Sequence, residues 1–263
     1  MSERASRRAL FVVTVLLFVA GATVTIEWCA SMLAMGAMEM PGGWTMSMTW
    51  MRMPGQTWAG AAASFLGMWI VMMIPMMLPS LVTMLLRYQR AVAGSGKSRL
   101  GRLTALVGTG YFFVWAVIGM VIFAAGVALA TLEMELPALA NAVPIAAGVV
   151  VLIAGALQFT AWKARCLACC RNAPVHGHPL AADVGTAWRH GVQLGLHCSA
   201  CCAGLMAILL VIGIMDLGAM ALVTAAITVE RLAPAGERVA RAIGIVVVAA
   251  GLLLIAQAAI GLA

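Results

Sequence analysis

Seven long apolar runs constrain this chain more than any motif does, because a helix needs roughly 20 apolar residues to cross a lipid bilayer. The runs lie at residues 9–28, 58–86, 103–132, 143–162, 190–214, 216–232 and 242–262. Only 10% of the 263 residues are charged and 64% are hydrophobic. A soluble domain carries about a quarter charged residues, so lipid must be the solvent for most of this chain. The sequence therefore predicts an all-α, polytopic transmembrane helix bundle with about seven spans, or six if the first is cleaved.

The basic residues indicate which loops stay in the cytoplasm. All but one of the 16 lysine and arginine residues lie in alternate loops, and the exception is Arg52. Positively charged loops are retained on the cytoplasmic side, which predicts a cytoplasmic N-terminus and an extracytoplasmic C-terminus. Short loops and a strong charge bias favour a bacterial inner (cytoplasmic) membrane. The net charge of +7 is therefore a topological signal, and we expect no nucleic-acid partner.

No loop is long enough for a separate soluble domain, so residues 1–263 are expected to form a single transmembrane domain. Two loops stand out, a Met-rich extracytoplasmic loop at 29–57 and a Cys/His cytoplasmic loop at 163–190. The first holds eight methionines between residues 31 and 57, Met46 and Met48 among them. Thioethers are soft, neutral ligands that suit Cu(I). The alternative is an interfacial anchor, because methionine and tryptophan also sit well at a headgroup boundary.

The second apolar run carries a stripe of methionines around two prolines. At helical spacing, four of them form neighbouring rows on one side of the helix: Met72, Met73, Met76 and Met77. Pro75 and Pro79 interrupt the backbone hydrogen-bond ladder, which membrane helices tolerate where other groups satisfy the freed carbonyls. Packing is one interpretation of the stripe. Metal ligation or ion passage is the other, and the adjoining Met-rich loop favours it.

Six of the seven cysteines form two copies of the pattern Cys-x-x-Cys-Cys. One copy, in the predicted cytoplasmic loop, is Cys166, Cys169 and Cys170. The other, inside the fifth run and preceded by His197, is Cys198, Cys201 and Cys202. In a helix this spacing places the three cysteines on one face, where they can converge on one ion or pair with each other. Cys198 is expected about 12 Å deep at 1.5 Å per residue, in the same layer as the methionine stripe.

The surroundings of the first copy also favour metal binding. It is followed by His176, His178 and His190, and cysteine with histidine in a short tract is typical of a metal site. Arg165 and Arg171 are expected to favour thiolate over thiol. Zinc is the competing metal for such a set, and cysteines can also hold an iron–sulfur cluster, but neither explains the methionines.

Four short motifs are similar to those of one known family. They are Met72-Met73-Ile74-Pro75-Met76-Met77-Leu78-Pro79, Cys166-Leu167-x-x-Cys170-Arg171, Cys201-Cys202-x-x-Leu205-Met206 and Met215-Asp216-Leu217. Over roughly residues 60 to 255 the chain resembles the membrane proteins grouped as domain of unknown function 2182. The resemblance implies a metal-binding integral membrane protein without a settled activity. That family carries a tryptophan after the paired cysteines, where this chain has Ala203.

The sequence leaves three functions open. The first is an integral membrane protein that binds, transports or delivers a soft metal ion, with copper as Cu(I) the expected ion and the lipid bilayer its surroundings. The second is a membrane thiol–disulfide oxidoreductase that uses the two cysteine copies. The third is a non-catalytic subunit or assembly factor that delivers metal to a membrane or periplasmic metalloprotein. No nucleotide-binding motif is visible and no catalytic residue is assigned, which favours a non-enzymatic role.

Overall fold

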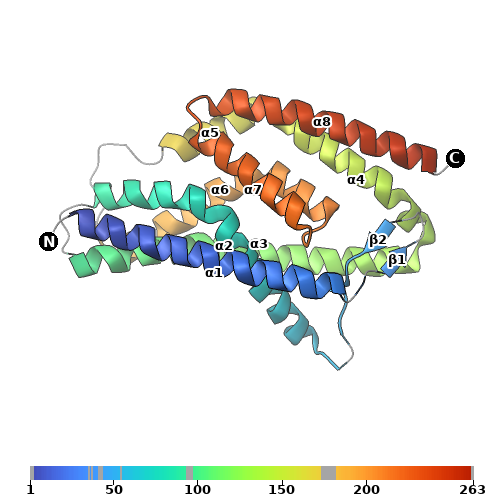
Figure 1. The fold of residues 1–263 in the computed structure, drawn as a ribbon, viewed down its shortest axis with the longest axis horizontal. Helices are drawn as coiled ribbons and strands as arrows, with labels where there is room; N and C mark the ends of the chain where they lie inside the picture. Colours follow the sequence, from blue (N-terminus) through green and yellow to red (C-terminus); the bar gives the residue numbers. More distant parts are fainter. Residues whose placement is uncertain are drawn as a thin grey trace.

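The structure is a bundle of helices with one small hairpin (Figure 1). It is a computed structural model that describes residues 3–34, 36, 38–40, 44–53, 55–92, 97–172 and 182–261. The helices are α1 (Glu3–Ala34), α2 (Trp58–Ala91), α3 (Lys97–Glu135), α4 (Pro137–Leu157), α5 (Ala161–Asn172), α6 (Val184–Ile212), α7 (Leu217–Leu232) and α8 (Gly236–Gly261). Strands β1 (Met38–Met40) and β2 (Trp44–Met46) pair antiparallel, and a short 3-10 helix, Met48–Trp50, follows them. The predicted fold class is confirmed.

Within the described residues, six helices are long and apolar enough to cross a membrane, namely α1, α2, α3, α4, α6 and α8. The predicted run 216–232 forms α7, whose 16 residues extend about 24 Å, less than the roughly 30 Å of a hydrocarbon core. Asp216 caps its start by accepting from the Ala219 N–H at 2.7 Å, and Pro234 follows its end. The two chain ends lie at opposite ends of the bundle (Figure 1), so α7 still reverses the chain direction between α6 and α8.

Helices α3 and α6 approach so closely that glycines of each meet the backbone of the other. A Cβ added to Gly110 would lie 2.8 Å from the Trp188 carbonyl oxygen, and one added to Gly195 would lie 2.9 Å from the Tyr111 carbonyl oxygen. Small residues allow this approach, and helices in lipid gain van der Waals contact from it. The approach places Tyr111 of α3 beside the turn of α6 that carries Cys198.

Helix α2 changes direction part-way along its length (Figure 1). It contains Pro75 and Pro79, which lack the N–H that the helix ladder requires and crowd the preceding turn. Gly21 of α1 packs against this part of α2, where an added Cβ would lie 3.0 Å from the Pro75 Cδ. The methionine rows of α2 are buried, and Met73 and Met77 are enclosed completely.

The predicted cytoplasmic loop at 163–190 is largely helical where the structure describes it, because α5 occupies its start and α6 its end. Helix α5 buries Lys163, Leu167 and Cys170, which share one face at the spacing i, i+4, i+7. Cys169 lies on the opposite, exposed face. The first cysteine copy therefore packs back against α6 instead of extending away from the bundle.

Candidate metal centre

Five sulfur-bearing side chains from three helices gather inside the bundle. We call them the inner thiol cluster: Met77 of α2, Cys170 of α5, and Cys198, Cys201 and Cys202 of α6. All five are buried, and the exposed fraction of Met77 and of Cys198 is 0%. The cysteines of α6 point inward together because residues at i, i+3 and i+4 lie on one face of a helix.

Cys198 makes the largest number of polar contacts described in this cluster. Its sulfur lies 3.9 Å from the Met77 Sδ and 2.7 Å from the Tyr111 hydroxyl. Arg231 donates from Nη1 to the same sulfur at 3.0 Å and from Nη2 to the Cys198 carbonyl oxygen at 3.0 Å. A guanidinium thus stands beside a sulfur that carries negative charge whenever it ligates a metal.

The other three cysteines complete two sulfur pairs. The Cys202 thiol donates to the Cys198 carbonyl oxygen at 3.1 Å and interacts with the Cys198 thiol. The Cys170 thiol donates to the His197 carbonyl oxygen at 3.6 Å and interacts with the Cys201 thiol. One pair lies within α6, whereas the other joins α5 to α6.

Three charged side chains are buried beside these pairs. Lys163 Nζ lies 2.8 Å from a carboxylate oxygen of Glu230 and donates to the Cys201 carbonyl oxygen at 2.7 Å. Among the described residues, Arg231 donates hydrogen bonds to Cys198 and to no carboxylate. A guanidinium keeps its charge when buried. The region therefore holds one positive charge beyond the neutral Lys163–Glu230 pair, and an anionic metal complex would balance it.

Local sequence does not mark Tyr111, Lys163 or Arg231 as members of this site, because each reaches the cysteines from another helix. The pair Glu230-Arg231 at the end of an apolar run was the one available signal. Ionisable residues next to the hydrocarbon core are costly unless they are paired, but from the sequence Arg231 counts only among the basic residues of the cytoplasmic loops.

The remaining residues of the predicted Cys/His set lie at the edge of the cluster or outside it. Cys166 is half-buried and Cys169 is exposed. His197 is exposed, and its Nδ1 lies 2.7 Å from the Gln193 carbonyl oxygen of the same helix, so its ring is held along α6. His190 is buried and stacks on Tyr88 with ring centroids 5.4 Å apart. His176 and His178 lie outside the described residues.

Arg165 favours the thiolate of Cys166 as expected, but it is outweighed. Burial, followed by the contact with Cys201, raises the pKa of the Cys166 thiol above its ordinary value, although Lys163 and Arg165 lower it. The contact with Cys201, followed by burial, raises the pKa of the Cys170 thiol. Arg165 is exposed, so water screens its charge. The side chain of Arg171 lies outside the described residues.

The methionines predicted as ligands divide between two regions. Met72, Met73 and Met76 are buried along α2 on the hairpin side of Met77. Met46 lies on β2, where it and Met40 are buried against alanines of α3 and α4. Met48 lies in the 3-10 helix, and its side chain is outside the described residues.

Strands β1 and β2 form what we call the outer hairpin, residues 38–46, of which the structure describes the two strands. Met38 pairs with Met46 and Met40 with Trp44, so the three thioethers share one face. Trp44 Nε1 donates to the Ala140 carbonyl oxygen at 2.9 Å, which holds the hairpin on α4. Figure 1 places the hairpin toward the end of the bundle that carries the C-terminus.

Cys29, the cysteine outside the two copies, also contacts a thioether. Its sulfur lies 3.9 Å from the Met215 Sδ, near the end of α1 and just before α7. No role was predicted for Cys29 from the sequence, because the contact joins residues far apart in the chain.

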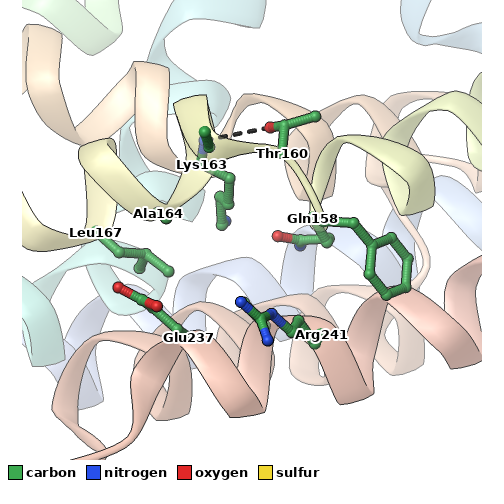
Figure 2. A pocket seen from close by; sticks show the side chains of 10 residues that line it. Gln158, Thr160, Lys163, Ala164, Leu167, Glu237 and Arg241 are labelled. Carbon is green, nitrogen blue, oxygen red and sulfur yellow. Dashed lines mark hydrogen bonds between the residues drawn. The ribbon is translucent and has the colours of Figure 1, made fainter.

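Two cavities are lined by buried charged residues of this region. One, of about 290 Å³, has Cys170 and Arg231 in its wall. The other, of about 270 Å³, lies between α5 and α8 beside Lys163. Figure 2 shows Gln158, Glu237 and Arg241 around this second cavity. Arg231 and Lys163 therefore each line a cavity.

The sulfur arrangement suits a soft ion with few ligands better than it suits zinc. Among the residues that the structure describes, no three cysteine, histidine or acidic side chains are placed to hold one ion. Structural zinc sites close with four such ligands. The cluster instead offers thiol pairs with the Met77 thioether 3.9 Å from Cys198. Thiolates and thioethers select Cu(I), an ion that accepts low coordination numbers.

One known family matches most of the chain. Residues 66–254 match the family model PpoB2, described as copper chaperone. The chain belongs to this copper chaperone family. The part matched by PpoB2 includes every member of the inner thiol cluster and excludes the outer hairpin. No curated protein and no solved structure matches the chain.

Proposed function

We propose that this protein binds Cu(I) inside the membrane at the inner thiol cluster and delivers it to an acceptor. Membership of a copper chaperone family and six helices long enough to cross a membrane support the proposal. The observation that carries it is the contact of the buried Cys198 sulfur with both Met77 and Arg231. A thiol and a thioether in contact are a soft donor pair, and the adjacent positive charge suits an anionic complex.

The buried charges favour a monovalent ion. Two thiolates around Cu(I) carry one net negative charge, which Arg231 neutralises, while Lys163 and Glu230 neutralise each other. The same two thiolates around Zn²⁺ are neutral and leave the guanidinium without a counter-charge, which is unfavourable in the interior. Charge balance and ligand softness therefore both favour Cu(I) over Zn²⁺.

The outer hairpin is a proposed weak site for copper on the extracytoplasmic side. Its thioethers, with Met48 in the next turn, are neutral ligands that bind Cu(I) weakly and exchangeably. The buried methionines of α2 continue from there toward Met77. At the other end, the half-buried Cys166 and the exposed Cys169, with His197, are proposed ligands near the surface.

The distribution of positive charge supports the proposed orientation. Basic residues lie at the end of α2, at the starts of α3 and α8 and near the start of α6, and all of these helix ends lie toward the N-terminal end of the bundle (Figure 1). The positive-inside rule supports a cytoplasmic location for this end, and we propose that the membrane is a bacterial inner membrane. The acceptor is then a metalloprotein of the membrane or of the periplasm.

A titration of Cu(I) against a chelator under reducing conditions tests the proposal on the purified full chain in lipid nanodiscs. Tight binding is expected, and its loss is expected when Cys198, Cys201 and Cys202 are all replaced by serine. Cys29→Ser is the matched control, because it alters a buried cysteine that the proposed centre does not use. An unaltered chain that takes up no Cu(I), or a triple variant that binds as tightly, refutes the proposal. Redox-active disulfides without metal uptake would indicate a thiol–disulfide enzyme.

A further inference from the structure

A polar cavity of about 290 Å³ lies between α2, α5 and α7, and Cys170 of the inner thiol cluster lines it. Ser80, Cys170 and Arg231 line its interior, and each is less than a tenth exposed. Thr83 and Arg87 also line it and are half-buried. The cavity therefore runs from a more open side to the thiol of Cys170.

The Ser80 hydroxyl is the clearest sign that this cavity holds a ligand. Its oxygen is buried, with the residue 1% exposed, and has no hydrogen-bond partner among the described residues. The neighbouring Thr83 hydroxyl donates to the Ser80 carbonyl oxygen at 2.8 Å and so does not satisfy it. A buried hydroxyl without a partner is unfavourable, and a polar ligand in the cavity would remove that cost.

We propose that this cavity receives a small anionic thiol that carries Cu(I), and that Cys170 exchanges the ion with it. Arg231 supplies positive charge for carboxylates, the Ser80 hydroxyl supplies a hydrogen-bond donor, and Cys170 supplies the sulfur. The volume is that of a small-molecule site and leaves no room for a protein loop. This inference rests on the proposed function, because it requires that the inner thiol cluster binds Cu(I).

The exchange conserves charge and changes no oxidation state. The bond between Cu(I) and the carrier sulfur breaks as a bond between Cu(I) and the Cys170 sulfur forms. The proton of the Cys170 thiol moves to the departing carrier thiolate, which leaves as a thiol. The ion then passes to Cys201, whose thiol interacts with that of Cys170.

The test compares Cu(I) uptake by the full chain in nanodiscs from two carriers. One is the Cu(I) complex of glutathione, which bears two carboxylates, and the other is the Cu(I) complex of β-mercaptoethanol, which bears none. At equal free Cu(I), uptake is expected to be about tenfold faster from glutathione, because the positive charge of Arg231 attracts its carboxylates. S-methylglutathione keeps the carboxylates but has no thiol, so it is expected to occupy the cavity and to remove this advantage.

A variant of a cavity residue tests whether the faster uptake from glutathione depends on this cavity. Thr83→Leu narrows the cavity and is expected to slow uptake from glutathione to the rate seen with β-mercaptoethanol. Thr109→Leu, the same change on an exposed part of α3, is the control. If Thr83→Leu fails to fold, competition by S-methylglutathione on the unaltered chain decides. Equal rates from both carriers, or no competition, overturn the carrier site. No uptake from either carrier and none in the chelator titration overturns the proposed function itself.

Discussion

The inner thiol cluster and the outer hairpin both gather sulfur, but their electrical surroundings differ. The Cys198 sulfur accepts from Arg231 at 3.0 Å, and the Lys163–Glu230 ion pair lies beside Cys201. Met46 of the hairpin packs against alanines and tryptophans. Thiolates are charged ligands that need a buried counter-charge, whereas thioethers are neutral and need none. The inner thiol cluster therefore has the buried charge that a thiolate site needs, whereas the outer hairpin has the neutral surroundings that suit thioethers.

Replacement of Cys198 is expected to give the largest difference between the two regions. Cys198→Ser removes the sulfur that contacts Met77, Tyr111 and Arg231, and the affinity for Cu(I) is expected to fall about 1,000-fold. Met46→Leu is expected to reduce it only a few-fold. Chelator competition measures both. Equal losses in the two variants would show that the regions do not differ in the way proposed.

The second effect concerns the stability of the inner region. Glu230→Gln leaves Lys163 without its ion-pair partner in the interior, and the free energy of unfolding is expected to fall by about 3 kcal/mol. Denaturant unfolding in detergent micelles measures the change. Glu237→Gln alters an exposed glutamate of α8 and is expected to leave stability unchanged. Adding Lys163→Met to Glu230→Gln should restore part of the loss, and no recovery would contradict the pairing argument.

The third effect is the contribution of the Arg231 charge to Cu(I) affinity, measured without removing any sulfur ligand. Arg231→Met removes the guanidinium but none of the sulfur atoms, and Cu(I) affinity is expected to fall about 10- to 100-fold, as for other groups that support a metal ligand. The preference for Cu(I) over Zn²⁺ should fall with it, because the neutral zinc complex no longer leaves a charge unbalanced. Arg231→Lys keeps the charge but loses the second hydrogen bond, so its loss should be smaller. An unchanged metal preference in Arg231→Met would refute the charge argument.

The predictable part of the site follows from rules that act along one helix. Lipid as solvent imposes long helices, so the bundle was predicted from the apolar runs alone. The spacing of Cys198, Cys201 and Cys202 predicted a shared face, and counting depth placed Cys198 in the layer of Met77, whose sulfur lies 3.9 Å away. These inferences need only the rise and period of a helix.

The unpredicted part depends on contacts between helices. The charges of Lys163 and Arg165 predict a loop after α4. Helix α5 forms there instead, because its buried face contacts α6 and α7. Arg231 likewise predicts only a cytoplasmic loop, although its side chain extends from α7 to contact Cys198. The outer hairpin was missed because three-residue strands carry little pattern. Charged residues inside a bundle are stable only through partners that local sequence does not reveal.

The smallest expected effect is the few-fold change in residual Cu(I) binding at the outer hairpin, which pH separates from binding at the inner thiol cluster. Each cysteine ligand exchanges a proton for Cu(I), so lowering the pH from about 7 to about 5 weakens binding at the inner thiol cluster. Thioethers have no proton to exchange, so binding at the outer hairpin is expected to stay constant. In a Cys198→Ser background, residual Cu(I) binding should therefore be nearly independent of pH and should fall a few-fold further on Met46→Leu. Met134→Leu, an exposed methionine of α3 beyond the hairpin, is the control. Residual binding that weakens in acid would assign it to the remaining thiols, and the hairpin would then have no part in binding copper.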